Sequence, residues 1–208
     1  MKILICEDHK IVRDGLRQIL KQLPEITLIQ EAADGEEAII HLKNWTFDIL
    51  LLDISLPGRS GLEVLQSVKR KWPLMNVLML SMHPEEAYAI RSLKYGASGY
   101  LTKDVASEEL LEAIKRVSLG RKYISESFAE SLSMHMDENF NIQKHKILSS
   151  REFETMIKLA GGKSLQEIAD ELFISNKTVS TYRSRIMQKM ELQKNADLTR
   201  YCLENNLI

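Results

Sequence analysis

An acidic residue follows a short apolar segment in the first half of the chain. Residues 49–52 read Ile-Leu-Leu-Leu, Asp53 comes next, and Pro57-Gly58 break the segment. Such a run predicts a strand buried on both faces, as in the middle of a parallel sheet. Ligands of these sheets bind just beyond the carboxyl ends of the strands, so Asp53 is a candidate site residue. The alternative is that Asp53 only caps the next helix, for which Ser60 is better placed.

Polar residues also end three other predicted strands. Glu7-Asp8 follow the first, Ser81 the fourth, and Thr102-Lys103 the fifth. These strand ends share one edge of a parallel sheet, so three carboxylates should meet there and favour Mg²⁺. A carboxylate can attack phosphorus, and Lys103 with Ser81 could hold the oxygens of a phosphoryl group on Asp53. Taken singly, each residue also has a simpler interpretation as a cap, a turn residue or a solvated charge.

The elements that must position these residues alternate along the first 120 residues. Five apolar segments are separated by stretches of helical period, with Asp34 and Ser107 as expected N-caps. This alternation predicts an α/β fold, a doubly wound five-stranded parallel sheet with helices on both faces. The expected strands are 2–6, 26–30, 47–52, 75–80 and 99–101, and the expected helices are 11–23, 36–43, 61–72, 85–94 and 107–119.

This part of the chain resembles the receiver domains of two-component response regulators. The resemblance covers roughly residues 1–120, and its motifs are Glu7-Asp8, L-L-D-I-S-L-P-G around Asp53, Ser81 after V-L-M-L, and G-Y-L-T-K at 99–103. It implies a flavodoxin-like fold with Asp53 as the phosphoacceptor. It also implies Mg²⁺ held by Asp8, Asp53 and the backbone carbonyl of Ser55, with Glu7 acting through water.

The resemblance implies a switch as well. Lys103 pairs with the phosphoryl group, the Ser81 hydroxyl moves towards it, and rotation of Tyr100 accompanies that move. Many receivers have a proline after the lysine, whereas this chain has Asp104. A cis peptide bond is therefore not expected at this position.

Composition limits the class of protein. With 208 residues, 44% of them hydrophobic, the chain can form one large or two modest domains with a real core. No apolar run approaches the roughly 20 residues of a membrane span, so we expect a cytoplasmic protein with no membrane partner. The two cysteines, Cys6 and Cys202, are too few and too isolated for a disulfide framework or a zinc site.

Four helical segments are expected in the last 63 residues. Ser149 or Ser150 starts the first, Ser164 the second and Ser175 the third, and the fourth covers residues 195–204. The second segment, 165–172, is separated by a short turn from the third, 176–190. This is the helix-turn-helix arrangement, in which the second helix of the pair enters the DNA major groove.

The charge distribution supports that interpretation. Although the net charge of the chain is only −1, the third segment carries four basic residues and no acid before Glu191. In a helix with about 100° per residue, Val179, Ile186 and Met190 should face the core. The opposite side of the helix is then polar and basic. Such a face suits phosphates and base edges, although it could also be the solvated face of an ordinary bundle. The candidate DNA-binding residues on this basis are Lys177, Thr178, Thr181, Ser184, Arg185, Gln188 and Lys189.

Residues 148–190 resemble the LuxR-type DNA-binding domain, and the two domains in this order resemble the NarL/FixJ response regulators. The motifs are L-S-S-R-E-F-E and G-K-S-L-Q-E-I-A-D-E-L-F-I-S-N-K-T-V-S-T-Y. By that resemblance Lys177 and Thr178 open the recognition helix against phosphates, and Ser180, Thr181 and Ser184 occupy base-reading positions. The resemblance also implies that the last helix forms a dimer contact through Ala196, Leu198 and Cys202. We expect a receiver at 1–120, a linker with a short helix at 121–145, and an all-α four-helix DNA-binding domain at 146–208.

These observations predict a phosphorylation-regulated, sequence-specific transcription regulator. Its expected partners are double-stranded DNA, a sensor histidine kinase or phosphotransfer protein, and a second copy of the chain when active. One alternative is an aspartate-nucleophile phosphohydrolase, but such enzymes have a second aspartate where this chain has Ser55. Another is a module that binds DNA constitutively and ignores phosphate.

Overall fold

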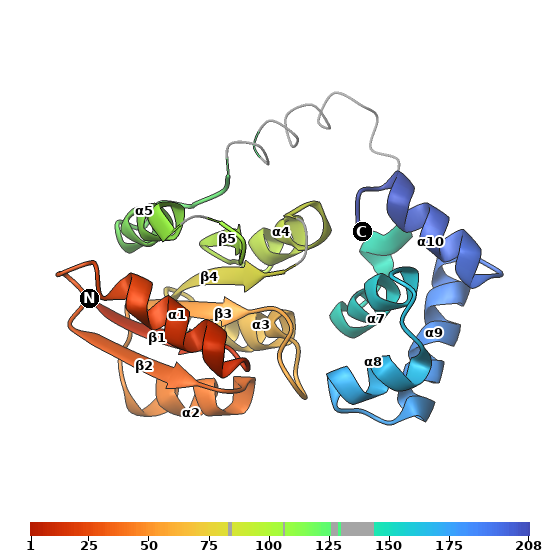
Figure 1. Ribbon diagram of the computed structural model, residues 1–208, viewed down its shortest axis with the longest axis horizontal. Coiled ribbons are helices and arrows are strands. Elements are labelled where there is room, and N and C mark those ends of the chain that lie inside the picture. The colour runs from red at the N-terminus through yellow and green to blue at the C-terminus, as the bar shows by residue number, and fades with distance from the viewer. Residues whose placement is uncertain (83–84, 106, 126–128, 130–143) are drawn as a thin grey trace. The chain divides into compact units, whose positions relative to one another are not determined.

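The computed structural model describes residues 1–82, 85–105, 107–125, 129 and 144–208, and these residues form two compact units (Figure 1). Unit 1 comprises Met1–Glu126 and unit 2 comprises Ser127–Ile208. None of the helices described is long and apolar enough to cross a membrane.

Unit 1 contains the predicted parallel sheet. Its strands lie in the order β2-β1-β3-β4-β5, and every neighbouring pair is parallel. The chain therefore starts near the middle of the sheet and winds outwards in both directions, which confirms the doubly wound α/β fold. The strands are β1 (Lys2–Cys6), β2 (Leu28–Ala32), β3 (Ile49–Asp53), β4 (Asn76–Ser81) and β5 (Gly99–Thr102).

Helices cover both faces of the sheet. One face packs against α1 (Lys10–Leu20) and α5 (Ser107–Ser118), and the other face carries α2 (Gly35–Asn44), α3 (Gly61–Lys71) and α4 (Glu85–Lys94) (Figure 1). Because both faces are covered, β3 is buried along its whole length, as its apolar run predicted. The core beneath α1 and α5 includes Ile3, Ile5, Leu51, Leu80 and Ile114.

Some element ends differ from the prediction. The first helix ends at Leu20 and not at Leu23, because Pro24 disfavours a helical conformation in the residue before it. The second strand starts at Leu28, two residues late, where it pairs with Lys2. Asp34 is an N-cap as expected and accepts hydrogen bonds from two backbone N–H groups, whereas Ser107 is the first helical residue of α5.

The first residues of the expected linker pack on the sheet of unit 1. Tyr123 forms a parallel bridge with Gly99, and its backbone N–H donates to the carbonyl of Ser98 at 2.9 Å. Its hydroxyl donates to Glu109 at 3.0 Å. This segment therefore covers the free edge of β5, which places residues 121–125 in unit 1. Most of the short helix expected after Ser125 lies outside the described residues.

The described part of unit 2, residues 144–208, contains a 3₁₀ turn followed by the four predicted helices. These elements are η1 (Lys144–Ile147), α7 (Ser150–Ala160), α8 (Leu165–Leu172), α9 (Asn176–Met190) and α10 (Asn195–Glu204). Ser149, Ser164 and Ser175 cap α7, α8 and α9 with their side chains, which fixes where these helices begin. Phe173 ends α8 in the left-handed conformation, so the chain turns directly into α9.

The α10 helix packs into the core of unit 2. Leu198 and Cys202 are fully buried in this single chain, so the expectation that they form a dimer contact is wrong. Their apolar side chains close the bundle beside α7. The exposed positions of α10 include Ala196 and Leu203. Both cysteines of the chain, Cys6 and Cys202, are buried and unpaired.

Candidate functional site

The carboxyl ends of β1, β3 and β5 bring three charged side chains together. Lys103 Nζ lies 2.6 Å from Glu7 Oε2 and 3.0 Å from Asp53 Oδ2. The side chains of Glu7 and Asp53 are 0% and 1% exposed, so this ion pair network is shielded from water. The parallel strands bring these side chains together, because Asp53 ends β3 and Lys103 directly follows β5.

Burial decides the electrostatics of this network. It raises the pKa of Asp53 above its ordinary value, and the ammonium group of Lys103 opposes that rise. The pKa of Glu7 is raised by burial and by the charge of Asp53. For Lys103, burial acts to lower the pKa, but Asp53 and Glu7 outweigh it and the pKa is raised. Two carboxylates thus share one ammonium group, and the excess negative charge suits a cation.

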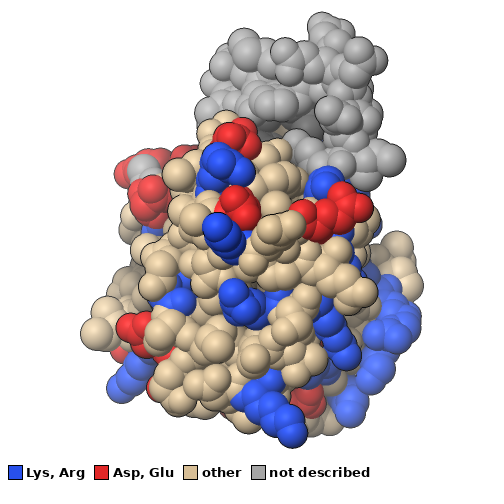
Figure 2. All heavy atoms as spheres, turned by 90° about the vertical axis from the view of Figure 1, so that its right-hand side faces the viewer, with Lys and Arg blue, Asp and Glu red and all other residues tan. Residues whose placement is uncertain are grey.

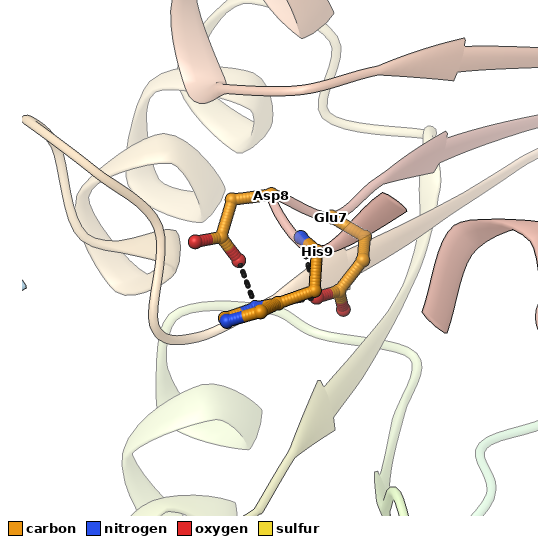
Figure 3. A group of neighbouring side chains, drawn as sticks. All are labelled: Glu7, Asp8 and His9. Atoms are coloured by element: carbon orange, nitrogen blue, oxygen red, sulfur yellow. Dashed lines mark hydrogen bonds and ion pairs between the residues drawn. The ribbon is translucent and has the colours of Figure 1, made fainter. Parts of the chain in front are cut away.

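Asp8 lies at the same strand end but faces a different neighbour. Its Oδ1 is 2.8 Å from Nδ1 of His9, which is also 3.4 Å from Glu7 Oε1. Figure 3 shows the imidazole of His9 beside both carboxylates. From α1, the guanidinium group of Arg13 donates to the carbonyl of Glu7 at 2.6 Å and to that of Asp8 at 3.1 Å. These bonds hold the backbone that carries the two acids.

The residues expected to bind Mg²⁺ offer buried carboxylate oxygen atoms. Asp53 Oδ1 and Asp8 Oδ1 are both buried. The Asp53 carboxylate accepts a backbone hydrogen bond from Ser55, which opposes the rise of its pKa, and Asp8 Oδ1 lies 2.8 Å from His9 Nδ1. Ser55, in the loop after β3, is half-buried, and no backbone hydrogen bond between described residues ends on its carbonyl. Hard oxygen donors in a buried site with excess negative charge fit a divalent cation such as Mg²⁺.

The two expected switch residues flank this site on β4 and β5. Ser81 is fully buried at the end of β4, next to Lys103, whose backbone N–H donates to the Ser81 carbonyl at 2.7 Å. Tyr100, on β5, is also fully buried and lies opposite Met79 in the register. The structure therefore places Ser81 beside Lys103 across the sheet edge and Tyr100 three residues before Lys103 in the chain. The Lys103-Asp104 peptide bond is trans.

The α9 helix presents the predicted polar face to solvent. Val179, Ile186 and Met190 are fully buried, while most of the candidate DNA-binding residues on the other faces of α9 are exposed. Figure 2 looks onto unit 2 and shows many Lys and Arg side chains over the lower part of that view, with few acidic side chains among them. The exposed candidates are Lys177, Ser180, Thr181, Ser184, Arg185, Gln188 and Lys189.

Some of these side chains already have partners within unit 2. Thr178 is half-buried, and its hydroxyl lies 2.8 Å from that of the N-cap Ser175. Lys189 Nζ lies 2.6 Å from Oε2 of Glu152, a buried acid of α7. Thr178 and Lys189 therefore contribute to the fold of the unit. No ion pair is recorded for Lys177 or Arg185 with the described residues, so their charges face solvent.

Three residues that contact the predicted site residues were not predicted from the sequence: His9, Arg13 and Glu152. His9 and Arg13 lie beside the acids because the chain turns from β1 into α1 within three residues. His9 directly follows Glu7-Asp8 in the sequence, so its position near the two acids could have been predicted. Arg13 and Glu152 act through contacts between elements, which no local pattern reveals.

Two family models match the chain. Residues 3–115 match the response regulator receiver domain, and residues 146–202 match the luxR family of bacterial regulatory proteins. The first match contains every residue of the site built around Asp53. The second contains the whole of α9.

Curated relatives match along the full chain. Response regulator UvrY of Escherichia coli K12 is 31% identical over 208 residues, covering 100% of this chain and 95% of the relative. The oxygen regulatory protein NreC of Staphylococcus carnosus is 35% identical over 215 residues, covering 100% of this chain and 99% of the relative.

Solved structures of response regulators match as well. One is RcsB from Salmonella enterica serovar Typhimurium bound to promoter rprA in the presence of the phosphomimetic BeF3⁻ (TM-score 0.69, 25% identity, 97% of each chain). Another is a LuxR-family regulator from Aurantimonas (TM-score 0.62, 33% identity, 66% of this chain and 98% of that one). The chain belongs to the NarL/FixJ family of two-component response regulators, transcription regulators that combine a receiver domain with a LuxR-type DNA-binding domain.

Proposed function

We propose that Asp53 accepts a phosphoryl group and that this modification controls DNA binding by α9. The observation that carries the proposal is the buried carboxylate of Asp53 at the end of β3, with Oδ2 3.0 Å from Lys103 Nζ. An oxygen of Asp53 forms a bond to phosphorus as the bond between phosphorus and the donor breaks. A histidine kinase, a phosphotransfer protein or a small phosphodonor supplies the group.

Asp8, Asp53 and the carbonyl of Ser55 would hold Mg²⁺, with Glu7 reaching it through water. When bound, Mg²⁺ supplies positive charge that offsets the carboxylates and the phosphoryl oxygens. The ammonium group of Lys103 has a different role from Mg²⁺. Lys103 Nζ lies close to both Asp53 and Glu7, so it can pair with a phosphoryl oxygen while Glu7 keeps it in place.

The switch follows from the position of Ser81. Ser81 ends β4, where its carbonyl accepts the backbone N–H of Lys103; its hydroxyl donates to the phosphoryl group once this is formed, and Tyr100 moves with it. The affected surface is formed by α4, β5 and α5. Two copies of the chain pair when phosphorylated, which matches the two-fold symmetry of paired half-sites in DNA.

The DNA contacts come from the exposed face of α9. Lys177 and Arg185 bind phosphates, and Ser180, Thr181, Ser184 and Gln188 reach base edges. Thr178 and Lys189 lie at the border of this face, and their side chains already contact Ser175 and Glu152. The proposed division is a receiver at 1–120, a linker at 121–145 and a DNA-binding domain at 146–208, with residues 121–125 of the linker packed on the receiver and Lys144 and His145 on the DNA-binding domain.

The family consists of DNA-binding regulators that are generally not enzymes. The competing proposal, a phosphohydrolase, needs a second acid two residues after the nucleophile, where this chain has Ser55. A turnover assay on a phosphoester separates the two proposals, because a regulator forms at most one phosphoryl adduct per chain without steady turnover.

Phosphoryl transfer is tested with a small phosphodonor and mass spectrometry of the intact chain. Wild type and Asp104→Asn should gain one phosphoryl group in the presence of Mg²⁺, and Asp53→Asn should gain none. Asp104 is a matched control because it is an exposed aspartate next to Lys103. Equal labelling of Asp53→Asn and wild type would refute the assignment of Asp53.

A further inference from the structure

A pocket of about 1040 Å³ opens at the edge of the unit 1 sheet where the strands begin. It is lined by residues at the starts of strands, such as Asp48 and Asn76, and by the last turns of α2, α3 and α5. In Figure 1 this is the side of unit 1 marked N. Asp53 lies at the other end of β3, roughly 13 Å beyond Ile49 at about 3.3 Å per residue. The pocket and the phosphorylation site are therefore separate.

We infer that this pocket binds a small amphipathic organic anion, a molecule with a flat aromatic body and one negatively charged group. The pocket combines aromatic and apolar walls, a fixed frame and two ammonium groups without ion pairs. None of its residues belongs to the proposed Mg²⁺ site or to α9. Binding of such a ligand is thus independent of the proposed function.

Both tryptophans of the chain line the pocket. Trp45 and Trp72 are the C-cap residues of α2 and α3. Their backbone N–H groups donate to the carbonyls of His41 at 2.9 Å and Val68 at 2.7 Å. Trp45 is nevertheless 56% exposed, and Leu74, another lining residue, is 95% exposed. Exposing so much apolar surface to water is unfavourable, and a flat aromatic ligand would cover it.

The frame of the pocket is already formed. Leu23 and Met75 are buried and connect the pocket to the core. The Lys69 ammonium group donates to the carbonyls of Pro73 at 3.4 Å and Met75 at 2.5 Å. The Met75 N–H donates to the Trp72 carbonyl at 3.0 Å, so the segment between α3 and β4 is fixed. Pre-formed hollows of about 300–1,000 Å³ with apolar and aromatic walls are typical of small-molecule sites.

Two lysines of the pocket have no ion pair with the described residues. They are Lys71, the last residue of α3, and Lys115, in the last turn of α5, and both are exposed. The pocket also contains two acids. Asp48 accepts the backbone N–H of Lys2 at 2.6 Å, so its carboxylate is engaged within the fold, and Glu25 is exposed. An anionic group can therefore pair with the lysines while the aromatic body of the ligand lies against the tryptophans.

The test uses the full chain and two fluorescent probes of similar shape. Anilinonaphthalene sulfonate is the anionic probe, and phenylnaphthylamine is its uncharged counterpart. The tryptophans are excited and the emission of the probe is recorded, because energy transfer requires a probe close to Trp45 or Trp72. We expect wild type to bind one anionic probe per chain and to bind it more tightly than the uncharged probe.

The lysines are tested with two double variants. Lys71→Met with Lys115→Met should weaken binding of the anionic probe at least about threefold, since each exposed ion pair contributes about 1.5–5-fold. Binding of the uncharged probe should stay unchanged. Lys43→Met with Lys94→Met is the matched control, because these exposed helical lysines carry the same charge and do not line the pocket. The control should bind both probes as wild type does.

The aromatic wall is tested with Trp45→Ala, which should weaken binding of both probes by about 2–12-fold, the scale of an aromatic contact. Calorimetry measures these affinities without relying on the removed indole. Circular dichroism and phosphodonor labelling of Asp53 confirm that each variant is folded.

Three results would overturn the inference and leave the proposed function intact. The first is equal or tighter binding of the uncharged probe by wild type. The second is unchanged affinity for the anionic probe in Trp45→Ala or in the variant that lacks Lys71 and Lys115. The third is a wild-type dimer in sedimentation experiments that Trp45→Ala abolishes, because the pocket would then hold a second copy of the chain. Failure of wild type to be labelled on Asp53 would instead count against the proposed function alone.

Discussion

Gly61, the first residue of α3, packs directly against the backbone of Asp53. A Cβ atom built on Gly61 would lie 2.0 Å from the Asp53 carbonyl oxygen, far inside van der Waals contact. The Gly61 N–H also donates to the Ile54 carbonyl at 2.8 Å. The loop after β3 therefore folds back on the strand end, and the position of Asp53 depends on a residue that has no side chain.

Replacing Gly61 by alanine should destabilise unit 1 and slow phosphorylation of Asp53. The added methyl group has to displace the backbone that carries Asp53, which we expect to cost about 1–3 kcal/mol, as for other overpacked sites. Denaturant unfolding and the rate of phosphodonor labelling measure the two effects. Gly15→Ala is the control, because a Cβ at Gly15 meets nothing within 4 Å and alanine favours the helix by about 0.5–1 kcal/mol. If Gly61→Ala has the same stability and the same labelling rate as wild type, the contact does not constrain Asp53.

Replacing Asp53 by asparagine should stabilise the folded chain at neutral pH in the absence of Mg²⁺. Burial raises the pKa of Asp53 in the folded state, so its ionised form opposes folding. That cost is fully present above the folded-state pKa and disappears as the pH falls towards the ordinary value of 3.8. Urea unfolding of both proteins across this pH range should show the advantage of Asp53→Asn shrinking with acid. An advantage that grows as the pH falls would contradict the assigned shift.

Mg²⁺ should reverse that order of stability. A ligand that binds only the folded chain at 100 times its Kd adds about 2.7 kcal/mol to the unfolding free energy. Wild type should gain this stability, and Asp53→Asn should gain much less, because it lacks one of the three proposed ligands. The measurement is urea unfolding with and without Mg²⁺, using Ca²⁺-free buffer. Equal gains in both proteins would place Mg²⁺ elsewhere.

Removal of the Lys103 ammonium group should destabilise unit 1 strongly at neutral pH. Lys103→Met leaves Glu7 and Asp53 without their shared cation, and breaking a buried pair in this way costs about 3–5 kcal/mol. The loss should diminish in acid, because protonation removes the two uncompensated charges. Lys115→Met, at an exposed position of α5, is the control and should stay within about 0.5 kcal/mol of wild type. A pH-independent effect of Lys103→Met would argue against this electrostatic cause.

Two basic residues of α9 should behave differently when replaced by alanine. Arg185 is exposed, so Arg185→Ala should weaken binding to a DNA fragment selected by wild type and reduce the salt slope by about 1. Lys189 pairs with buried Glu152, so Lys189→Ala should destabilise unit 2 by about 1–3 kcal/mol. Salt-dependent DNA titrations and thermal unfolding distinguish the two effects. Loss of stability in Arg185→Ala without a change in salt slope would contradict the DNA role.

The sheet, and the edge of it where the charged residues lie, could be predicted from the sequence because those features are local or fixed by topology. The apolar run before Asp53 predicted a buried strand, and parallel strands necessarily place Asp53 and Lys103 at one edge. The serine caps of unit 2 were also predictable, since capping depends on residues three apart in sequence.

Features that depend on packing between elements were not predictable in this way. Helical period alone does not show that Leu198 and Cys202 of α10 face inwards, because an apolar stripe can cover either a core or a partner. The pairing of Tyr123 with Gly99 was not predicted either, because an isolated bridge at a sheet edge leaves no periodic pattern in the sequence. Likewise, the proximity of His9 to Asp8 depends on a backbone turn and a side-chain rotamer.

The most direct test of the account is a DNA retardation assay with the full chain, using a fragment selected from genomic DNA by wild type. With Mg²⁺ and a small phosphodonor, the DNA affinity of wild type should rise by a factor of about 5–150, the usual range of coupling between two sites. Asp53→Asn should show the same affinity with and without the donor. An equal response of the two proteins, or no response of wild type that has been labelled on Asp53, would contradict control of DNA binding by phosphorylation at this residue.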